Sequence, residues 1–471
     1  MNTWNHTKII ATVGPACLGK AVLLEMIKAG VSVFRLNGAH GSFKQHQDTI
    51  NNIRQLSQQY KTSTAILMDL PGPKYRLGDL KKEPIELKKN QTIVLACRKT
   101  TQTDSRIPVP QAIHACLKKG DQIFLNDGLV GLKVKSVEGT DVTCVVNAGG
   151  EIRSRKGINL PGVKLNVPAL TEADKKILDF AIKAKVDFIG LSFVRSARNV
   201  ETVKKILKRH APQIGVIAKI EKPEALDDID NIIEVADAVM VARGDLGIEI
   251  PFPKLPLVER DILRRCMIAG KPSITATQML ESMVNSKRPT RAEATDVAEA
   301  VWAGSDAVML SEETAIGINP AEAVKAMAAI AYEAESDMPP LPQRRREFES
   351  SSLQSQIIAE GAVLIAEELG AQAIVTPTRS GRTPLFVSQQ RPPMPILAPI
   401  SNQNMARRMS LFWGVVPILT TDAASVDKIL IQAEKVARQS AYIEKGDRIV
   451  ITSGAHGTKD DLMRLVEVRQ I

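Results

Sequence analysis

Two charged side chains, Lys219 and Glu221, stand two positions apart in VIAKIEKPEALDD (216–228), within a run typical of a β-strand. Residues two apart on a strand point to the same face, so a cation and a carboxylate lie side by side there. A structural ion pair would explain both, but a second carboxylate, Asp245, follows the next apolar run in ARGDLG (242–247). Two converging carboxylates with few other protein ligands suit Mg²⁺ or Mn²⁺, which keeps several waters and binds substrate phosphates. We therefore expect metal-assisted phosphoryl chemistry, with Lys219 neutralising charge on the phosphoryl group.

Further polar residues stand where other apolar runs end. Gly244 opens a predicted helix whose backbone N–H groups can bind a carboxylate or a phosphate, although a tight turn would also explain this glycine. Thr277 is a weaker signal because threonine is common in strands. His40, in LNGAHG (36–41), is a lone histidine, and such residues are more often structural than ligands. In chain order the polar strand ends are Thr12, Arg35, Asn37, Asp69, Ser192, Arg195, Lys219, Glu221, Gly244, Asp245, Thr277, Gln278, Ser311 and Glu313.

Eight short runs of apolar and β-branched residues must position these side chains, and a helical pattern follows each run. Eight such units favour a (β/α)8 TIM barrel of the α/β class, with its active site at the C-terminal ends of the strands. An open doubly wound sheet gives the same alternation, so the number of units is what favours closure. The predicted strands are residues 7–14, 31–37, 64–70, 186–194, 214–221, 238–245, 272–279 and 307–312.

The alternation stops after the third run and resumes at Thr171, an expected helix N-cap. The interruption reads as short alternating strands with glycine-containing turns, which predicts a small β-barrel placed as a lid over the mouth of the larger barrel. A Pro- and Ser-rich stretch and a second α/β pattern follow the last unit. The expected domains are the barrel at 1–72 and 166–338, the lid at 73–165, a linker at 339–352, and a C-terminal α/β domain at 353–471.

Composition limits the classes of partner. The net charge is +10 and the pI about 9.3, but aromatic residues make up only 4% and the basic residues are dispersed, which favours small anionic substrates over nucleic acid. No apolar run approaches the roughly 20 residues that cross a bilayer. The N-terminal residues lack the pattern of a signal peptide, so we expect no membrane partner and a cytoplasmic location. The five cysteines are widely spaced, which predicts reduced and mostly buried thiols.

Longer motifs place the chain within a known family. VIAKIEKPEALDD resembles the signature around the catalytic lysine and the metal-binding glutamate of pyruvate kinases. The resemblance covers essentially the whole chain and implies the transfer of a phosphoryl group from phosphoenolpyruvate to ADP, giving pyruvate and ATP in the final step of glycolysis. It also implies a Mg²⁺ or Mn²⁺ cofactor and a homotetramer. The other matching motifs are IIATVGPA (9–16), RKGINLPG (155–162), ARGDLGIEIP (242–251), ATQMLESM (276–283) and RPTRAEATDVAEAV (288–301).

The resemblance also implies roles for the residues already singled out. Arg35 is similar to the arginine that holds the phosphoryl group of phosphoenolpyruvate, and Lys219 to the lysine that stabilises it during transfer. Glu221 and Asp245 resemble the metal ligands, while Gly244, Asp245 and Thr277 resemble the set that binds the substrate carboxylate, with Thr277 near the water that protonates enolpyruvate. The residues that resemble a nucleotide-binding set are Arg76, Lys156, Asn37 and His40.

Several positions depart from the family pattern. Potassium-dependent members typically read LNFSHG and DTKGPE where this chain has LNGAHG (36–41) and DLPGPK (69–74), so Ala39 replaces a hydroxyl and Lys74 an acid. We expect the Lys74 ammonium, with Asn37 and Asp69, to take the place of bound K⁺, because a lysine at this position resembles the potassium-independent members of the family. The alternative is that Lys74 is a solvated loop lysine beside a degraded potassium site. Further departures at Gly38, Pro71 and Glu312 would alter substrate handling without abolishing it.

Two other functions remain open from the sequence. Another metal-dependent enolpyruvate or keto-acid enzyme on the same barrel would share the two carboxylates but would not need the nucleotide-facing residues. A metabolite-sensing homologue without catalysis would bind ligands but not turn them over. In the C-terminal domain a turn with hydroxyls and arginines could bind a sugar-phosphate or nucleotide effector, although an ordinary helix cap explains it equally well. Its residues are Thr378, Arg379, Ser380, Gly381, Arg382 and Thr383.

Overall fold

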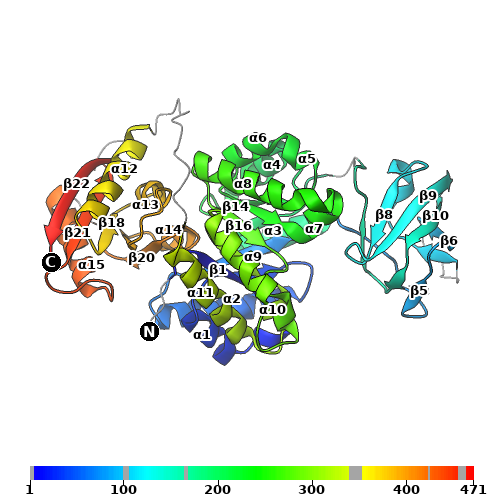
Figure 1. The fold of residues 1–471 in the computed structure, drawn as a ribbon, viewed down its shortest axis with the longest axis horizontal. Coiled ribbons are helices and arrows are strands. Elements are labelled where there is room, and N and C mark those ends of the chain that lie inside the picture. The colour runs from blue at the N-terminus through cyan, green and yellow to red at the C-terminus, as the bar shows by residue number, and fades with distance from the viewer. Residues whose placement is uncertain (1–4, 99–104, 164–167, 339–352, 423–424, 455–462) are drawn as a thin grey trace.

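The computed structural model describes residues 5–98, 105–163, 168–338, 353–422, 425–454 and 463–471. Eight parallel strands close into a barrel in the order β1-β17-β16-β15-β14-β13-β3-β2, which confirms the predicted α/β barrel (Figure 1). Apolar residues line both faces of these strands, because one face fills the barrel and the other meets the helices. The strands are β1 (Lys8–Val13), β2 (Val31–Asn37), β3 (Ala65–Leu70), β13 (Phe188–Leu191), β14 (Gly215–Ile220), β15 (Ala238–Ala242), β16 (Ser273–Ala276) and β17 (Ala307–Leu310).

Three predicted strands extend too far at their C-terminal ends. β13 ends at Leu191, and Phe193 has a φ of 54° that no strand can hold. β15 ends at Ala242, so Asp245 lies on a helix rather than on the strand. β16 ends at Ala276, because Thr277 turns the chain at a positive φ of 76°. Ser192, Asp245 and Thr277 therefore lie on the connections that leave the strands, whereas Arg35, Asp69 and Lys219 lie on the strands themselves.

Helices surround the barrel and bury their apolar faces against it. Thr171 caps α3 as predicted: its hydroxyl accepts from the Asp174 N–H at 3.0 Å, and the Asp174 carboxylate accepts from the Thr171 N–H at 2.8 Å. The other Asp174 oxygen accepts from the Gly72 N–H at 3.0 Å, which ties this helix to the loop that leads into the lid. The helices are α1 (Lys20–Lys28), α2 (Phe43–Gln59), α3 (Glu172–Lys183), α4 (Ala197–His210), α5 (Glu224–Asp227), α6 (Ile229–Val235), α7 (Arg243–Glu249), α8 (Leu255–Ala269), α9 (Arg291–Trp302), α10 (Glu312–Ala315) and α11 (Pro320–Ser336).

The segment inserted after β3 forms a separate β-rich lid with its own apolar core. Seven strands pair in the order β4-β12-β8-β9-β10-β6-β7, and β11 pairs with β5. Two strands next to the barrel, β4 and β12, pair antiparallel, so the chain enters and leaves the lid side by side. The lid strands are β4 (Tyr75–Arg76), β5 (Ile85–Leu87), β6 (Thr92–Ala96), β7 (Arg106–Pro108), β8 (Gln122–Leu125), β9 (Val130–Glu138), β10 (Asp141–Ala148), β11 (Gly150–Ile152) and β12 (Gly157–Asn159).

The C-terminal domain has a five-stranded sheet in the order β20-β19-β18-β21-β22. In Figure 1 it lies on the opposite side of the barrel from the lid. The linker expected at 339–352 lies outside the described residues. The elements of this domain are α12 (Leu353–Glu368), β18 (Ala373–Val375), α13 (Arg382–Ser388), β19 (Ile396–Ile400), α14 (Gln403–Met409), β20 (Val415–Leu419), α15 (Val426–Gln439), β21 (Arg448–Gly454) and β22 (Met463–Gln470).

Ion pairs fix the C-terminal domain to the N-terminal end of the barrel. An aspartate stands just before β13, β15 and β17, and each carboxylate accepts from the backbone N–H that begins the neighbouring strand. Its other oxygen faces an arginine of the C-terminal domain. The three pairs are Asp187–Arg407 at 2.9 Å, Asp237–Arg408 at 3.1 Å and Asp306–Arg391 at 3.0 Å. Leu411 packs into the apolar cluster that fills this end of the barrel.

The cysteines and the apolar helices bear on two expectations from composition. All five cysteines are free, and all but the half-buried Cys116 are buried. No helix in the described part of the chain is long and apolar enough to cross a membrane.

Candidate active site

The Lys219 ammonium is the centre of the polar cluster at the mouth of the barrel. Lys219 points from β14 toward the Ser192 hydroxyl at 2.7 Å, the Glu221 carboxylate at 2.9 Å and Asp69 at 3.2 Å. The residue is only 8% exposed. Burial by itself lowers the pKa of Lys219, but Asp69 and Glu221 outweigh it, so the pKa lies above its ordinary value. Lys219 is therefore a permanent cation, held by three oxygen atoms at the end of its strand.

Arg35 brings a second cation to the same carboxylate. Its Nε and Nη2 donate to Asp69 Oδ2 at 3.0 and 2.5 Å, and its Nη1 donates to the Thr12 hydroxyl at 3.1 Å. β2 and β3 are neighbours whose register sets Asn37 opposite Asp69, which places Arg35 within reach. Burial raises the pKa of Asp69, but Lys219 and Arg35 outweigh it and hold that pKa below its ordinary value. A single aspartate thus orients both cations.

Glu221 and Asp245 suit a divalent cation. Glu221 is 1% exposed, and burial raises the pKa of its carboxyl above the ordinary value; Lys219 opposes this rise and Asp245 adds to it. A divalent cation between two such carboxylates would offset their repulsion. Among the described residues there is no group of three or more His, Cys, Asp or Glu side chains that could hold a metal. The remaining ligands would then be water and substrate oxygen atoms, which is usual for Mg²⁺.

Gly244 and Thr277 meet beside the start of α7. The Gly244 N–H donates to the Thr277 hydroxyl at 2.7 Å, and this hydroxyl donates to the Ala276 carbonyl at 2.5 Å. The N–H expected to bind a substrate carboxylate is therefore occupied by Thr277 in this structure. A side chain at position 244 would place its Cβ 3.3 Å from the Thr277 hydroxyl, a tight contact that glycine avoids.

Lys74 does not lie where a potassium substitute was expected. Its Nζ donates to Asp245 at 2.9 Å and lies 3.9 Å from Asp127 of the lid. Among the described residues no hydrogen bond joins it to Asn37 or Asp69, the neighbours expected from the sequence. Lys74 thus connects the first strand of the lid to one of the two candidate metal ligands.

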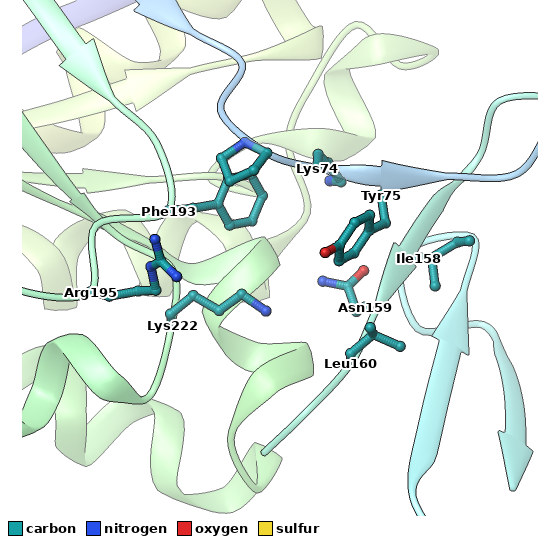
Figure 2. Close-up of a pocket in the computed structure, with 9 residues that line it drawn as sticks. Lys74, Tyr75, Ile158, Asn159, Leu160, Phe193, Arg195 and Lys222 are labelled. Carbon is teal, nitrogen blue, oxygen red and sulfur yellow. The ribbon is translucent and has the colours of Figure 1, made fainter. Parts of the chain in front are cut away.

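The lid also contacts the far end of α7. Lys222 Nζ donates to Glu249 at 2.6 Å, and the Asn159 amide of β12 donates to the same carboxylate at 3.3 Å. Figure 2 shows Lys222 extending from the barrel side toward Asn159 on the lid side, with Tyr75 and Phe193 beside them. Helix α7 is therefore held by the lid at both ends, through Asp245 and through Glu249.

The nucleotide-binding candidates form two pairs. Arg76 stands opposite Gly157 across β4 and β12, which places it next to Lys156 on the lid. The Arg76 guanidinium donates to the Arg155 carbonyl at 3.0 Å. Asn37 ends β2 and the exposed His40 lies on the loop that follows, where the Asn37 side chain accepts from the Ala39 N–H at 3.1 Å.

The effector candidates form the turn that begins α13. Thr378 accepts from the Gly381 N–H at 3.0 Å, and Gly381 has a φ of 80°. Thr383 is buried, whereas Arg379 is exposed and lies 3.3 Å from Asp422. The arginines of this turn do not converge on one point through any described contact, so an effector site there stays a prediction.

Several residues of the cluster received no role from the sequence. Ser192 was noted only as a strand end, although it binds Lys219. Lys222 and Glu249 form a buried pair beside the lid, and Arg243 pairs with Asp296 behind Thr277. Lys222 and Arg243 each stand next to a residue that was singled out, and that adjacency was the available signal.

Comparisons with known proteins agree with this geometry. The family model described as the pyruvate kinase barrel domain matches residues 4–324, and the one described as the pyruvate kinase alpha/beta domain matches residues 356–466. A pyruvate kinase of Clostridium acetobutylicum is 37% identical over 99% of both chains. That of Geobacillus stearothermophilus is 41% identical over 99% of this chain and 80% of its own. One from Staphylococcus aureus is 40% identical over 95% of this chain and 77% of its own. With a closed barrel, its polar mouth and these matches along nearly its whole length, the chain belongs to the pyruvate kinase family.

Proposed function

We propose that this chain transfers the phosphoryl group of phosphoenolpyruvate to ADP, giving pyruvate and ATP, with Mg²⁺ or Mn²⁺ bound at Glu221 and Asp245. The bond between phosphorus and the enol oxygen breaks, a bond from phosphorus to an ADP β-phosphate oxygen forms, and the methylene carbon of enolpyruvate takes up a proton. The observation that carries the proposal is the Lys219 ammonium, buried among Asp69, Ser192 and Glu221 at the mouth of the barrel.

Arg35 and Lys219 are the groups that act on the phosphoryl group in transit. Asp69 holds both side chains through one oxygen atom, so neither cation has to reorganise when charge moves from the enol oxygen to ADP. Such preorganised cations are the main contribution that a protein makes to phosphoryl transfer. The divalent cation would supply further charge neutralisation and a template for the substrate oxygen atoms.

Gly244, Asp245 and Thr277 are proposed to surround the carboxylate end of the substrate. Bringing the Gly244 N–H to the substrate requires it to release the Thr277 hydroxyl, which would then be available near the carbon that is protonated. The nucleotide is proposed to bind between Asn37 and His40 on the barrel and Arg76 and Lys156 on the lid, whose closure would exclude water from the transfer.

Lys74 is proposed to make the reaction independent of K⁺. Its ammonium supplies a fixed positive charge beside Asp245 at 2.9 Å, and a movement of the first lid strand would bring it toward Asn37 and Asp69. Ala39 and Leu70 offer no side-chain oxygen to a monovalent cation in the same loops. The wild-type enzyme should therefore reach full activity in buffers whose only monovalent cation is tetramethylammonium.

The proposal also includes a cellular location, an oligomeric state and an effector site. A glycolytic reaction would place the protein in the cytoplasm, and the resemblance to pyruvate kinases implies a homotetramer. The turn at 378–383 is proposed to bind a phosphorylated effector, such as a sugar phosphate or a nucleotide. Each needs its own measurement, by fractionation, by sedimentation and by binding assays.

The deciding experiment is an assay of pyruvate release from phosphoenolpyruvate in which ADP, Mg²⁺ and K⁺ are varied one at a time. Release that requires ADP and a divalent cation, with matching ATP formation, supports the proposal. Pyruvate formed from oxaloacetate without ADP would instead indicate a keto-acid enzyme on the same barrel. Binding of phosphoenolpyruvate without turnover would indicate a sensing protein, and either result would overturn the proposed reaction.

A further inference from the structure

The connection that leaves β16 has an uncommon backbone conformation at the residue proposed to assist protonation. Thr277 has a φ of 76° and Gln278 a φ of 55°, so two consecutive residues lie in the left-handed region. That region is a genuine outlier for a β-branched residue such as threonine and costs on the order of 1–3 kcal/mol. Such a conformation persists only where surrounding groups hold it, so the contacts of Thr277 must supply that stabilisation.

Two consecutive residues of α7 hold Thr277 from different sides. The Gly244 N–H donates to its hydroxyl at 2.7 Å, which sets the side-chain rotamer. The Arg243 guanidinium donates through Nη2 to its carbonyl oxygen at 2.9 Å. That carbonyl belongs to the peptide between Thr277 and Gln278, so Arg243 fixes the peptide plane on which both left-handed conformations depend.

The Arg243 guanidinium is itself fixed by carboxylates. Nη1 and Nη2 donate to the two oxygen atoms of Asp296 at 2.7 and 2.6 Å, in the bidentate geometry that orients a guanidinium most strongly. Glu259 lies 3.7 Å from Nη1 on another side. The Arg243 side chain is 11% exposed, so little of this hydrogen bonding is exchanged with water. The one Nη2 N–H that Asp296 does not use is shared between the Thr277 carbonyl and the Met279 sulfur.

We propose that Arg243, aligned by Asp296, is a positioning residue that holds Thr277 in the conformation required for protonation of the enolpyruvate carbon. This inference rests on the proposed function and adds to it a pair of residues with no described contact to Arg35 and Lys219 or to the candidate metal ligands. Thr277 is the group that acts near the substrate, and Arg243 acts through its carbonyl oxygen.

Lysine cannot replace Arg243 in this role. An ammonium at the same place keeps the positive charge beside Asp296, but it lacks the planar fork that binds a carboxylate and a carbonyl in fixed directions at once. Arg243→Lys should therefore release the peptide after Thr277 while leaving the charge of the region unchanged. Asp296→Asn is the second test, because it keeps the volume of the side chain and weakens the alignment of the guanidinium.

Both variants should lower kcat by between about 10- and 100-fold, the cost of a small misplacement of a catalytic group. The KM for phosphoenolpyruvate should rise by a smaller factor than kcat falls, since Thr277 also borders the substrate carboxylate, and the Kd for Mn²⁺ should stay within about 3-fold of wild type, since Glu221 and Asp245 are untouched. The matched control is Arg260→Lys: this exposed arginine lines a surface pocket together with Arg243, Thr277 and Asp296 but makes no described contact with Thr277, and its replacement should leave all three constants unchanged.

A second readout isolates the proton transfer. Exchange of the pyruvate methyl protons with D₂O, followed by NMR in the presence of Mg²⁺ and ATP, should slow in parallel with kcat in both variants. A double-mutant cycle with Thr277→Val then tests whether Arg243 acts through Thr277. If it does, Arg243→Lys adds less than about 2-fold in the valine background, because the group that it positions is already gone.

Three outcomes would overturn the inference: wild-type kcat in both variants, a loss confined to KM, or effects of Arg243→Lys and Thr277→Val that multiply in full. If one variant lowers the melting temperature, the double-mutant cycle with Thr277→Val is made with the other variant. Effects that multiply in full in that cycle overturn the inference, and effects that do not multiply support it. These results are distinct from a failure of the proposed function, which would appear as absence of ATP formation by the wild-type enzyme itself.

Discussion

Replacing Lys74 by methionine should tighten divalent-cation binding and reduce turnover in the same protein. Lys74 Nζ lies 2.9 Å from Asp245, so a metal that binds this carboxylate must displace the ammonium or share the oxygen atom with it. Methionine keeps the unbranched stem and removes only the charge. Asp245 would then be free for the metal before any substrate arrives.

The size of the effect follows from the burial of the pair. The side chains are 20% and 25% exposed, which is intermediate between a surface ion pair and a buried one. An exposed pair contributes up to about 1 kcal/mol and a hydrogen bond to a charged group about 1.5–3 kcal/mol, so we take about 1–2 kcal/mol here. Removing that competition should lower the Kd for Mn²⁺ by about 5- to 30-fold, since 1.4 kcal/mol is a factor of ten.

Turnover should move the other way. Without the fixed charge of Lys74, kcat in potassium-free buffer should fall at least about 10-fold, as expected for the loss of one electrostatic contact to the reacting groups. Added K⁺ should restore only part of it, because Ala39 and Leu70 supply no side-chain oxygen to the cation.

The assay combines calorimetric Mn²⁺ titration with pyruvate release in tetramethylammonium buffer. Lys135→Met is the matched control, since Lys135 is exposed on β9 and makes no described ion pair; it should change neither quantity. An unchanged Mn²⁺ affinity in Lys74→Met would refute the competition for Asp245. Strong stimulation of the wild-type enzyme by K⁺ would refute the replacement of potassium by Lys74.

Three further predictions concern groups away from this pair. Asp69→Asn should lower kcat about 100-fold, because Arg35 and Lys219 lose the acceptor that aligns both; near wild-type kcat would exclude that role. Burial lowers the pKa of Lys8 from 10.5 to about 8. The unfolded chain therefore binds more protons between these pH values, and stability should rise with pH by up to about 3 kcal/mol. Urea midpoints should show this rise in wild type and not in Lys8→Met. Asp187→Ala leaves Arg54 and Arg407 without their buried carboxylate, which should cost about 3–5 kcal/mol in urea unfolding without changing KM.

The barrel and the centre of its mouth could be predicted because each depends on a short-range rule. The alternation of apolar runs and helical patterns gave all eight strands, and the two-residue period of a strand set Lys219 beside Glu221. Asp69 and Arg35 followed from the rule that chemistry collects at the C-terminal ends of barrel strands. Asp245 and Thr277 lie at the mouth of the barrel, as predicted, but on a helix and a turn and not on strands. A run of apolar residues does not show where a strand ends and a helix or a left-handed turn begins.

The partners of these residues could not be predicted, because they join segments far apart in the chain. The contact of Lys74 with Asp245 depends on where the lid lies, and that of Arg243 with Asp296 on where α7 and α9 lie after two different strands. Neither follows from spacing or hydrophobic period. The bound positions of K⁺ and of an effector depend in addition on loop conformations, which a sequence pattern describes least well.

The two ends of the barrel show how a structural carboxylate can be told from a functional one. At the N-terminal end, both carboxylate oxygen atoms of Asp187, Asp237 and Asp306 are engaged, one by a backbone N–H and the other by an arginine. At the mouth, both Glu221 oxygen atoms are likewise engaged, by Lys219 and by the Phe193 N–H, but Asp69 Oδ1 is buried without a hydrogen-bond partner in the described structure. Unsatisfied capacity of this kind is costly in a folded protein unless something binds there. The accounting of carboxylate oxygen atoms thus separates the three aspartates that hold the C-terminal domain to the barrel from Asp69 at the mouth.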